Sequence, residues 1–180
     1  DAVKASALQA VRKLQALGVR ALLVTGDNKG SASLVGSALG MDGIEAEVLP
    51  ADKAAIVGKL KQEGSTVAMV GDGINDAPAL AAADVGIAMS TGTDVAMHAA
   101  GITLMRGDPA LVADAIDISR RTYRKIRQNL FWAFAYNILG IPLAAFGLLN
   151  PMVAGAAMAL SSVSVVTNAL MLRNWVPNSP

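Results

Sequence analysis

Three short segments of the chain carry side chains suited to phosphoryl chemistry. They are Thr25-Gly26-Asp27, Lys53 near the start of a predicted helix, and the loop Gly71-Asp72-Gly73-Ile74-Asn75-Asp76. The loop brings two carboxylates and an amide together with flexible glycines, and magnesium is commonly held by one or two carboxylates together with the substrate's phosphate oxygens. A lysine in a first helical turn opposes the helix dipole, a placement that is understandable if the ammonium group faces a phosphoryl group.

Each segment also has a plainer interpretation. Thr25-Gly26-Asp27 alone is as readily an ordinary turn, because these residue types are common in turns. Lys53 alone could be a solvated surface lysine, and the loop 71–76 could be a structural turn. The first and third segments, however, directly follow predicted buried strands, and open α/β sheets place their active sites at the ends of strands. The three segments together therefore favour a phosphoryl site.

The elements that must position these groups follow from the apolar periodicity of the first part of the chain. The pattern predicts helices over 5–17, 32–39, 53–62 and 77–83, and strands over 19–24, 45–49, 66–70, 85–88 and 102–104. Asp52 is the predicted N-cap of the third helix. The alternation of helices and strands indicates a mostly parallel sheet covered by helices on both faces. Residues 1–108 are therefore expected to form an α/β domain.

The later part of the chain is predicted to enter a membrane. Hydrophobic residues make up 53% of the sequence and charged residues 16%, and residues 128–172 carry no charge at all. A membrane-spanning helix needs about 20 residues, so two helices fit, over 129–149 and 152–172, with a turn at Asn150-Pro151. A buried helical pair of a soluble protein is the alternative, but such a pair rarely needs two uncharged stretches in succession.

Basic residues flank this hairpin and predict its orientation. A basic connecting helix over 109–128 carries five of them, namely Arg120, Arg121, Arg124, Lys125 and Arg127, and Arg173 follows the second span. The positive-inside rule then places residues 1–128 and the tail 173–180 in the cytoplasm. Trp132 and Trp175 suit the two interfacial positions.

Polar residues within the spans are candidates for a transport site, because such residues are costly in a bilayer. Tyr136 and Asn137 lie in the first span, and Met158, Ser161 and Ser162 share a face of the second by helical spacing. A thioether suits soft copper(I), but amide and hydroxyl oxygens do not. Taken alone, these residues are therefore better explained by helix packing through serines.

Two of the motifs resemble a known family. Thr25-Gly26-Asp27-Asn28 and the stretch GDGINDAPAL over 71–80 resemble the haloacid-dehalogenase-like phosphorylation domain in the form found in P-type ATPases. The resemblance implies one function for each matching residue: Thr25 and Gly26 contact the phosphoryl group, Lys53 neutralises its charge, Asp72 binds Mg²⁺, and Asn75 and Asp76 order the site. Asp27 is assigned to both catalysis and nucleotide binding. Asp1 and Lys4 resemble an Asp-x-x-Arg element near the nucleotide, with Lys in place of Arg.

The membrane residues resemble the copper(I)-transporting subgroup of that family. Tyr136-Asn137 and Met158-x-x-Ser161-Ser162 are similar to its signature in the last two membrane helices, whereas related zinc and cadmium pumps typically carry charged residues there. The resemblance implies ATP-driven transport of a heavy-metal cation, copper(I), through an aspartyl phosphate, with ATP and Mg²⁺ as cofactors. It also implies an integral protein of the plasma (inner) membrane whose partners are the upstream part of the same pump, the lipid bilayer and a metal chaperone.

Several features are missing from the sequence and limit what it predicts. The family's nucleophile lies in a DKTGT string, which is not present, and the chain has no cysteine. The chain starts at Asp1, which we interpret as a cut, so the nucleophile and most of the nucleotide-binding domain are expected upstream. A net charge of +1 and 4% aromatic residues argue against nucleic-acid binding. A haloacid-dehalogenase-like phosphatase and a non-catalytic membrane fragment are the alternative functions.

Overall fold

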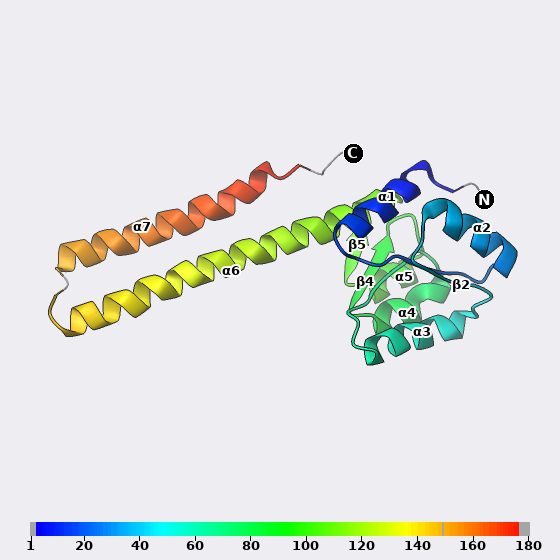
Figure 1. Cartoon of the computed structure of the whole chain (residues 1–180), viewed down its shortest axis with the longest axis horizontal. Helices are drawn as coiled ribbons and strands as arrows, with labels where there is room; N and C mark the ends of the chain where they lie inside the picture. The colour runs from blue at the N-terminus through cyan, green and yellow to red at the C-terminus, as the bar shows by residue number, and fades with distance from the viewer. Residues whose placement is uncertain (1–2, 149, 177–180) are drawn as a thin grey trace. The chain divides into compact units, whose positions relative to one another are not determined.

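The computed structural model describes residues 3–148 and 150–176, and the chain divides into two units, Asp1–Asp114 and Ala115–Pro180. The first unit alternates helices and strands (Figure 1). Its elements are α1 (Ala5–Ala16), β1 (Leu22–Val24), α2 (Lys29–Leu39), β2 (Gly43–Glu45), α3 (Pro50–Gln62), β3 (Ala68–Gly71), the short 3₁₀ helix η1 (Ile74–Asp76), α4 (Ala77–Ala82), β4 (Val85–Met89), α5 (Asp94–Ala99) and β5 (Ile102–Leu104). The predicted parallel α/β fold is confirmed.

The strands form two parallel sheets instead of the single sheet predicted. β1 pairs with β2, and β3, β4 and β5 form the second sheet in that order. Within the residues that the structure describes, β1 and β3 each have a strand partner on one side only. No strand of the described chain bridges these two edges, which is why the sheet is divided.

The prediction for β2 was wrong by two or more residues. A strand was expected over 45–49, but the observed strand ends at Glu45, in register with Val24 of β1. Glu47 has a φ of +58°, a conformation that an extended strand cannot contain. Leu49 is already the N-cap of α3, so no room remains for a longer strand.

Two helices begin three residues earlier than predicted because of their caps. The side chain of Asn28 accepts a hydrogen bond from the backbone N–H of Ser31, and α2 therefore starts at Lys29. Pro50 occupies the first turn of α3, where its missing N–H costs nothing, so Leu49 and not Asp52 is the N-cap. Asp52 instead lies in the first helical turn, where a carboxylate favours the dipole.

The core of the first unit supports the strand ends. Leu80 of α4 and Ile87 of β4 are fully buried, and Val57 of α3 packs with Val67 and Ala79 in one apolar cluster. Burying an aliphatic side chain of this size stabilises a fold by about 1.5–3 kcal/mol. The packing therefore holds α3 and α4 against the sheet of β3, and β3 ends at Gly71, the first residue of the predicted magnesium loop.

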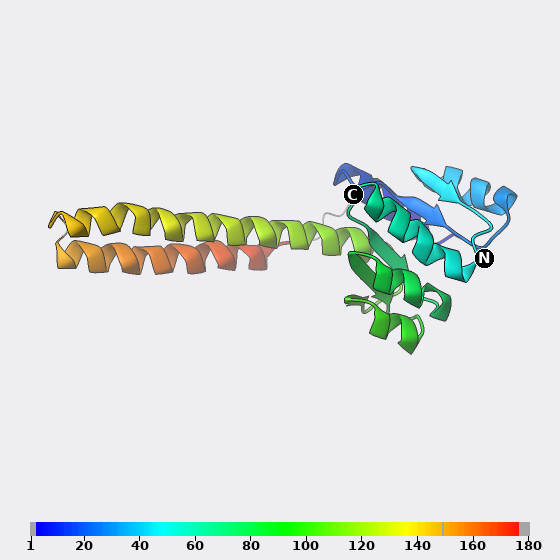
Figure 2. The ribbon, with the colours of Figure 1, turned by 90° about the horizontal axis from the view of Figure 1, so that it is seen from below.

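The second unit contains two long helices. α6 (Ala110–Ala145) begins in the first unit and continues into the second, so the predicted connecting helix and first span are one helix. α7 (Pro151–Leu170) follows, and a 3₁₀ turn η2 (Met171–Asn174) extends it. Asn150 caps α7 through a hydrogen bond from Met152 N, as the predicted turn requires. Within this unit α6 and α7 lie side by side in both views (Figures 1 and 2).

Among the residues that the structure describes, one helix has the length and composition to cross a membrane, over Met152–Asn174, and its apolar window is not buried. This helix matches the second predicted span. The first predicted span, 129–149, includes polar residues such as Asn129 and Asn137 within α6 and ends at a residue outside the described ranges. It stays a prediction.

Candidate functional site

Asp76 is the centre of the phosphoryl-site candidate. Its carboxylate oxygen Oδ1 accepts a hydrogen bond from Lys53 Nζ at 2.7 Å, and Oδ2 accepts from the backbone N–H groups of Asp72 and Gly73 at 3.3 and 3.1 Å. Asp76 is 8% exposed and is the buried charged residue of the described chain. One side chain thus joins α3 to the loop that follows β3. The structure brings together Lys53, Asp76 and the backbone of Asp72, and their roles at a phosphoryl site stay predictions.

The electrostatics of Asp76 follow from this network. Burial disfavours the carboxylate and by itself raises the pKa of Asp76. The hydrogen bonds from Lys53, Gly73 and Asp72 and the charge of Lys53 outweigh burial, so the pKa of Asp76 lies below its usual value. Asp76 is therefore an ionised, fully engaged carboxylate that orders the loop.

Asp72 and Asn75 differ from Asp76 because both are exposed. Asp72 follows β3 directly, and its backbone is fixed by its own N–H bond to Asp76. Gly71 must lack a side chain, since an added Cβ would lie 2.6 Å from Cβ of Asp76. The loop thus presents the exposed carboxylate of Asp72 next to the buried carboxylate of Asp76, which is paired with Lys53.

The Thr25 segment forms a separate turn on the β1–β2 sheet. Thr25 N donates to Glu45 O at 2.9 Å, and Thr25 Oγ1 accepts from Asp27 N at 3.1 Å. The hydroxyl can still donate its own hydrogen to an anion. Gly26 and Asp27 are exposed, and a Cβ at Gly26 would lie 3.4 Å from Val48 O. The structure thus connects this turn to β2 and not to the Asp76 network.

The residues predicted to lie near the nucleotide are only partly described. Asp1 lies outside the described residues. Lys4 Nζ donates to the backbone oxygen of Gly107 at 2.6 Å, which ties the start of α1 to the segment between β5 and α6. The nucleotide role of Lys4 stays a prediction, and its ammonium already has a structural acceptor.

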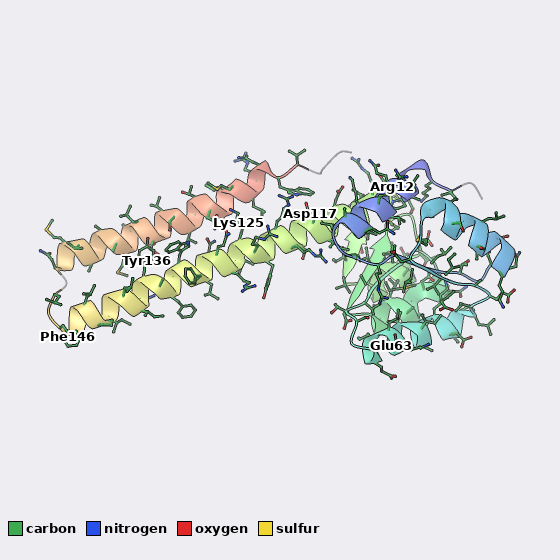
Figure 3. The ribbon with its side chains drawn as sticks, in the orientation of Figure 1. Arg12, Glu63, Asp117, Lys125, Tyr136 and Phe146 are labelled. Carbon is green, nitrogen blue, oxygen red and sulfur yellow. The ribbon has the colours of Figure 1, made fainter. Side chains whose placement is uncertain are left out.

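The polar residues of the predicted transport site bond within their own helices. Asn137 Nδ2 donates to Ala133 O at 2.8 Å, and Ser162 Oγ donates to Met158 O at 3.2 Å. The Met158 side chain is 74% exposed. Tyr136 instead lines a cavity of about 390 Å³ together with Ser164 and Asn168 of α7. Figure 3 shows Tyr136 and Lys125 on α6.

Hydrogen bonds join α6 and α7 nearer to the start of the hairpin. Asn168 of α7 accepts from Lys125 Nζ at 2.5 Å and donates to Asn129 Oδ1 at 2.7 Å. Asn168 was not among the residues selected from the sequence, because the hairpin was predicted from its lack of charge. The available signal was an amide side chain within the second span, since polar residues are costly in a bilayer.

The chain is similar to one protein-family model, to curated relatives and to solved structures. The family model of haloacid dehalogenase-like hydrolases matches residues 1–84. A copper-exporting P-type ATPase of Staphylococcus aureus (strain bovine RF122 / ET3-1) is 58% identical over 173 residues, which cover 96% of this chain and 22% of that protein. The crystal structure of a zinc-transporting PIB-type ATPase in the E2.Pi state matches 96% of this chain and 28% of its own, at 39% identity and a TM-score of 0.87. The chain is homologous to copper-exporting P-type ATPases.

The homology covers nearly the whole of this chain but a small part of its relatives. The chain spans about a fifth of the length of the S. aureus copper-exporting ATPase. The catalytic domain of the CPx-ATPase CopB-B is also similar, at 35% identity and a TM-score of 0.57 over 61% of this chain and 44% of that one. A P-type ATPase relationship therefore holds for both the α/β unit and the helical hairpin.

A second loop, which the sequence patterns did not single out, lies beside the stretch GDGIND. Thr93 N donates to Asp72 O at 2.8 Å, and a Cβ at Gly92 would lie 2.4 Å from the same oxygen. Thr93 also caps α5 by accepting from Ala96 N at 3.3 Å. The signal was present, because Gly92 and Thr93 follow β4 at the same strand ends as Asp72. These two residues fix the backbone that carries the predicted magnesium ligand.

The donor set at Asp72 suits magnesium in the way that this ion is usually bound. Within the described ranges, no group of three or more His, Cys, Asp or Glu side chains could hold a metal by itself. Magnesium, however, typically takes only one or two carboxylates and completes its shell with water and substrate phosphates. The exposed carboxylate of Asp72 fits that requirement, whereas Asp76 is occupied by Lys53.

Proposed function

We propose that this chain is the carboxy-terminal part of a pump that exports copper(I), with the ATP reaction passing through an aspartyl phosphate formed on an upstream segment. The observation that carries the proposal is the Lys53–Asp76 ion pair, which fixes the loop of Asp72 at the end of β3. Phosphoryl transfer depends mainly on positioning and charge neutralisation, and this network supplies both. The chain contains no DKTGT string, so the nucleophile must come from elsewhere in the pump.

Each residue of the α/β unit has a role in this proposal. Lys53 neutralises charge on the phosphoryl group, and Asp76 holds the Lys53 ammonium and the loop backbone in place. Thr25 and Gly26 bind phosphoryl oxygens through a hydroxyl and an accessible backbone, with Asp27 and Asn75 completing the two loops. Asp72 would hold magnesium, which supplies further charge neutralisation when bound. Asp1 and Lys4 are proposed to lie near the nucleotide.

The division of the sheet supports an upstream contribution to this site. β1 and β3 each have one unpaired edge among the described residues, and exposed strand edges are normally covered or paired. A parallel strand from the upstream part of the pump would pair with them and bring the Thr25 and Asp72 loops to one edge. Because the two loops follow the carboxyl ends of β1 and β3, a parallel strand between them would also end at the phosphoryl site.

The cargo assignment rests on the polar residues of the hairpin. We propose that Tyr136, Asn137, Met158, Ser161 and Ser162 contribute to the metal path. Met158 supplies a thioether, which suits copper(I) better than zinc, and no charged residue occurs between Gln128 and Leu172. The copper-exporting relative is 58% identical to this chain, and the zinc-transporting structure is 39% identical. A copper(I) chaperone is a proposed partner.

The proposed placement is in the plasma (inner) membrane. Residues 1–128 and the tail 173–180 face the cytoplasm, because the basic residues that flank the hairpin favour that side. The candidate span Met152–Asn174 then crosses the bilayer, and α6 supplies the second helix of the hairpin.

The test of the proposal is metal-stimulated ATPase activity of the intact pump in lipid. We expect stimulation by copper(I) and little by zinc, with loss of copper(I) stimulation in Met158→Leu. Met152→Leu is the matched control, because Met152 is also an exposed methionine of α7. Stimulation by zinc alone, or equal effects of the two variants, would contradict the cargo assignment.

A second test separates the pump from the phosphatase alternative. The chain purified by itself is expected neither to hydrolyse ATP or a small phosphomonoester nor to form an acid-stable acyl phosphate from labelled ATP. Turnover of a phosphomonoester by this chain alone would favour the phosphatase. Strong labelling from ATP would show that the nucleophile lies within these 180 residues.

A further inference from the structure

A basic groove lies beside the start of the helical hairpin, within the second unit. The groove has a volume of about 340 Å³. Arg121, Arg124 and Lys125 of α6 line one side, and Met171, Asn174 and Trp175 line the other. All of these residues come from the same unit, so the groove does not depend on how the α/β unit is placed.

The charges of the groove are only partly cancelled within the chain. Arg121 Nε pairs with Asp117 Oδ2 at 2.9 Å, and Trp175 Nε1 donates to the same oxygen at 3.0 Å. Lys125 Nζ bonds to neutral atoms, Asn168 Oδ1 at 2.5 Å and Met171 Sδ at 4.0 Å. Among the described residues, neither Lys125 nor Arg124 forms an ion pair with a carboxylate. Arg124 also interacts electrostatically with Asp117, so three cations face the carboxylate of Asp117 and the groove retains a net positive charge.

The groove lies at the same level along the hairpin as the end of the candidate membrane span. That span ends at Asn174, and Trp175 follows it. Tryptophan with a hydrogen-bonded indole N–H is typical of the headgroup level of a bilayer. Leu170 and Met171 are exposed next to the groove on the membrane side, so an apolar surface continues from the basic groove into the span.

We propose that this groove binds the phosphate headgroup of an anionic phospholipid, with its acyl chains along the exposed apolar side chains of Leu170 and Met171. The inference rests on the membrane placement of the proposed function. Arg124 supplies a planar guanidinium that can donate two hydrogen bonds to phosphate oxygens, and Lys125 supplies a point charge held in place by Asn168. Asn174 and Trp175 lie on the aqueous side of Lys125, because Trp175 bonds to Asp117 whereas Lys125 bonds to Asn168, and they can contact the polar headgroup beyond the phosphate.

The geometry favours a lipid over a free phosphate ion. Free phosphate would gain only from the two cations, and its hydration would oppose binding to so open a site. A phospholipid adds the burial of its chains against an apolar helix surface and is already concentrated at this depth. A basic residue near a membrane surface contributes about a fivefold gain in affinity for anionic lipid.

The proposed test uses Trp175 as a reporter of the lipid beside it. The chain has two tryptophans, so Trp132→Phe leaves Trp175 alone. This variant is placed in bilayers of phosphatidylcholine with an equal fraction of brominated lipid, as either phosphatidylglycerol or phosphatidylcholine, and fluorescence quenching is measured. Brominated phosphatidylglycerol is expected to quench Trp175 more strongly, with a relative association constant about fivefold higher or more.

Two charge variants provide the matched comparison. Arg124→Gln is expected to reduce the preference for phosphatidylglycerol to about one fifth of its value. Arg127→Gln removes the same charge from the same helix, but Arg127 lies over the ring of Tyr123 at 6.0 Å and outside the groove lining, so the preference should be retained. Because Arg124 is exposed, its replacement should not disturb folding.

Each of the other results would overturn the proposal in a distinguishable way. Equal losses in Arg124→Gln and Arg127→Gln would mean that only general charge attraction operates. Millimolar inorganic phosphate that abolishes the preference would identify a free phosphate site instead. Equal quenching by the two brominated lipids would exclude headgroup recognition but leave the membrane placement intact, whereas quenching by neither would contradict that placement as well.

Discussion

Asp76 in the α/β unit is hydrogen-bonded to three other residues from two segments of the chain, whereas Asn137 and Ser162 in the hairpin bond to carbonyl oxygens of their own helices. The first arrangement links elements that are distant in sequence and therefore fixes a geometry. The second satisfies the polar groups within each helix and does not fix Asn137 and Ser162 relative to each other.

This difference has a functional meaning. Lys53, Asp76 and the Asp72 backbone are preorganised, so this part of the site needs no rearrangement to hold its shape. Met158 is 74% exposed, so little of its surface is held by packing. We infer that the Lys53–Asp76 part of the proposed phosphoryl site is already ordered in this chain, whereas the proposed metal site requires ligands from membrane helices outside it.

The largest expected effect comes from removing the cation of the preorganised site. Lys53→Met in the intact pump should lower the rate of phosphoenzyme formation by about 100-fold or more, because a charge-stabilising group at the reaction centre is lost. The measurement is incorporation of labelled phosphate from ATP under single-turnover conditions.

Lys61→Met is the matched control for this prediction. Lys61 also lies on α3 and pairs with Asp84 at 3.1 Å, but both side chains of that pair are more than a third exposed. An exposed pair contributes little, so this variant should keep its rate. Equal losses in the two variants would show that Lys53 acts through the stability of α3 alone.

A smaller effect is expected from the loop that supports Asp72. Gly92→Ala places a Cβ 2.4 Å from the Asp72 oxygen and must displace one of the two loops. The rate of phosphoenzyme formation should fall by about tenfold, since displacements of about 1 Å can cost up to about 100-fold. A raised magnesium requirement is expected in the same assay.

Gly58→Ala tests whether any added methyl group has this effect. Gly58 lies within α3, and a Cβ there meets no atom within 4 Å. Alanine is the better helix former by about 0.5–1 kcal/mol, so the activity should be unchanged and α3 slightly more stable. A normal rate for Gly92→Ala would remove the Gly92–Thr93 loop from the site.

The smallest effect concerns pH. The pKa of Asp76 is lower in the folded chain than in the unfolded one, so its contribution to stability is fully present above about pH 3.9 and is lost as the pH falls through the folded value. The difference in hydrogen-exchange protection at the Asp72 and Gly73 amides between the wild type and Asp76→Asn should therefore shrink on acidification. A difference that grows as the pH falls would contradict the assignment.

The sequence predicted the α/β fold because the apolar periodicity of most elements matches their burial. It failed where a local backbone requirement decided the outcome. Glu47 at positive φ ends β2 early, and Pro50 shifts the start of α3 by three residues. Both effects come from the backbone conformation at a single residue, which the apolar periodicity does not indicate.

The site was predictable to the extent that it depends on strand ends. Lys53 and Asp76 were selected from residue type and place, and the structure joins them. The place of Thr93 at a strand end was also predictable, but its hydrogen bond to Asp72 was not, since that bond depends on the register of β4 against β3. The roles of Met158 and Asn137 remain predictions, because in the proposed pump they depend on helices outside this chain.

The most direct test of the contrast between the two regions is copper(I) binding by this chain alone and by the intact pump, in the same lipid. If the hairpin supplies only part of the metal site, the chain alone should bind copper(I) at least about tenfold more weakly, and X-ray absorption should show fewer sulfur ligands. Equal affinity and an equal sulfur shell in the two proteins would contradict the account, because the hairpin would then hold a complete metal site by itself.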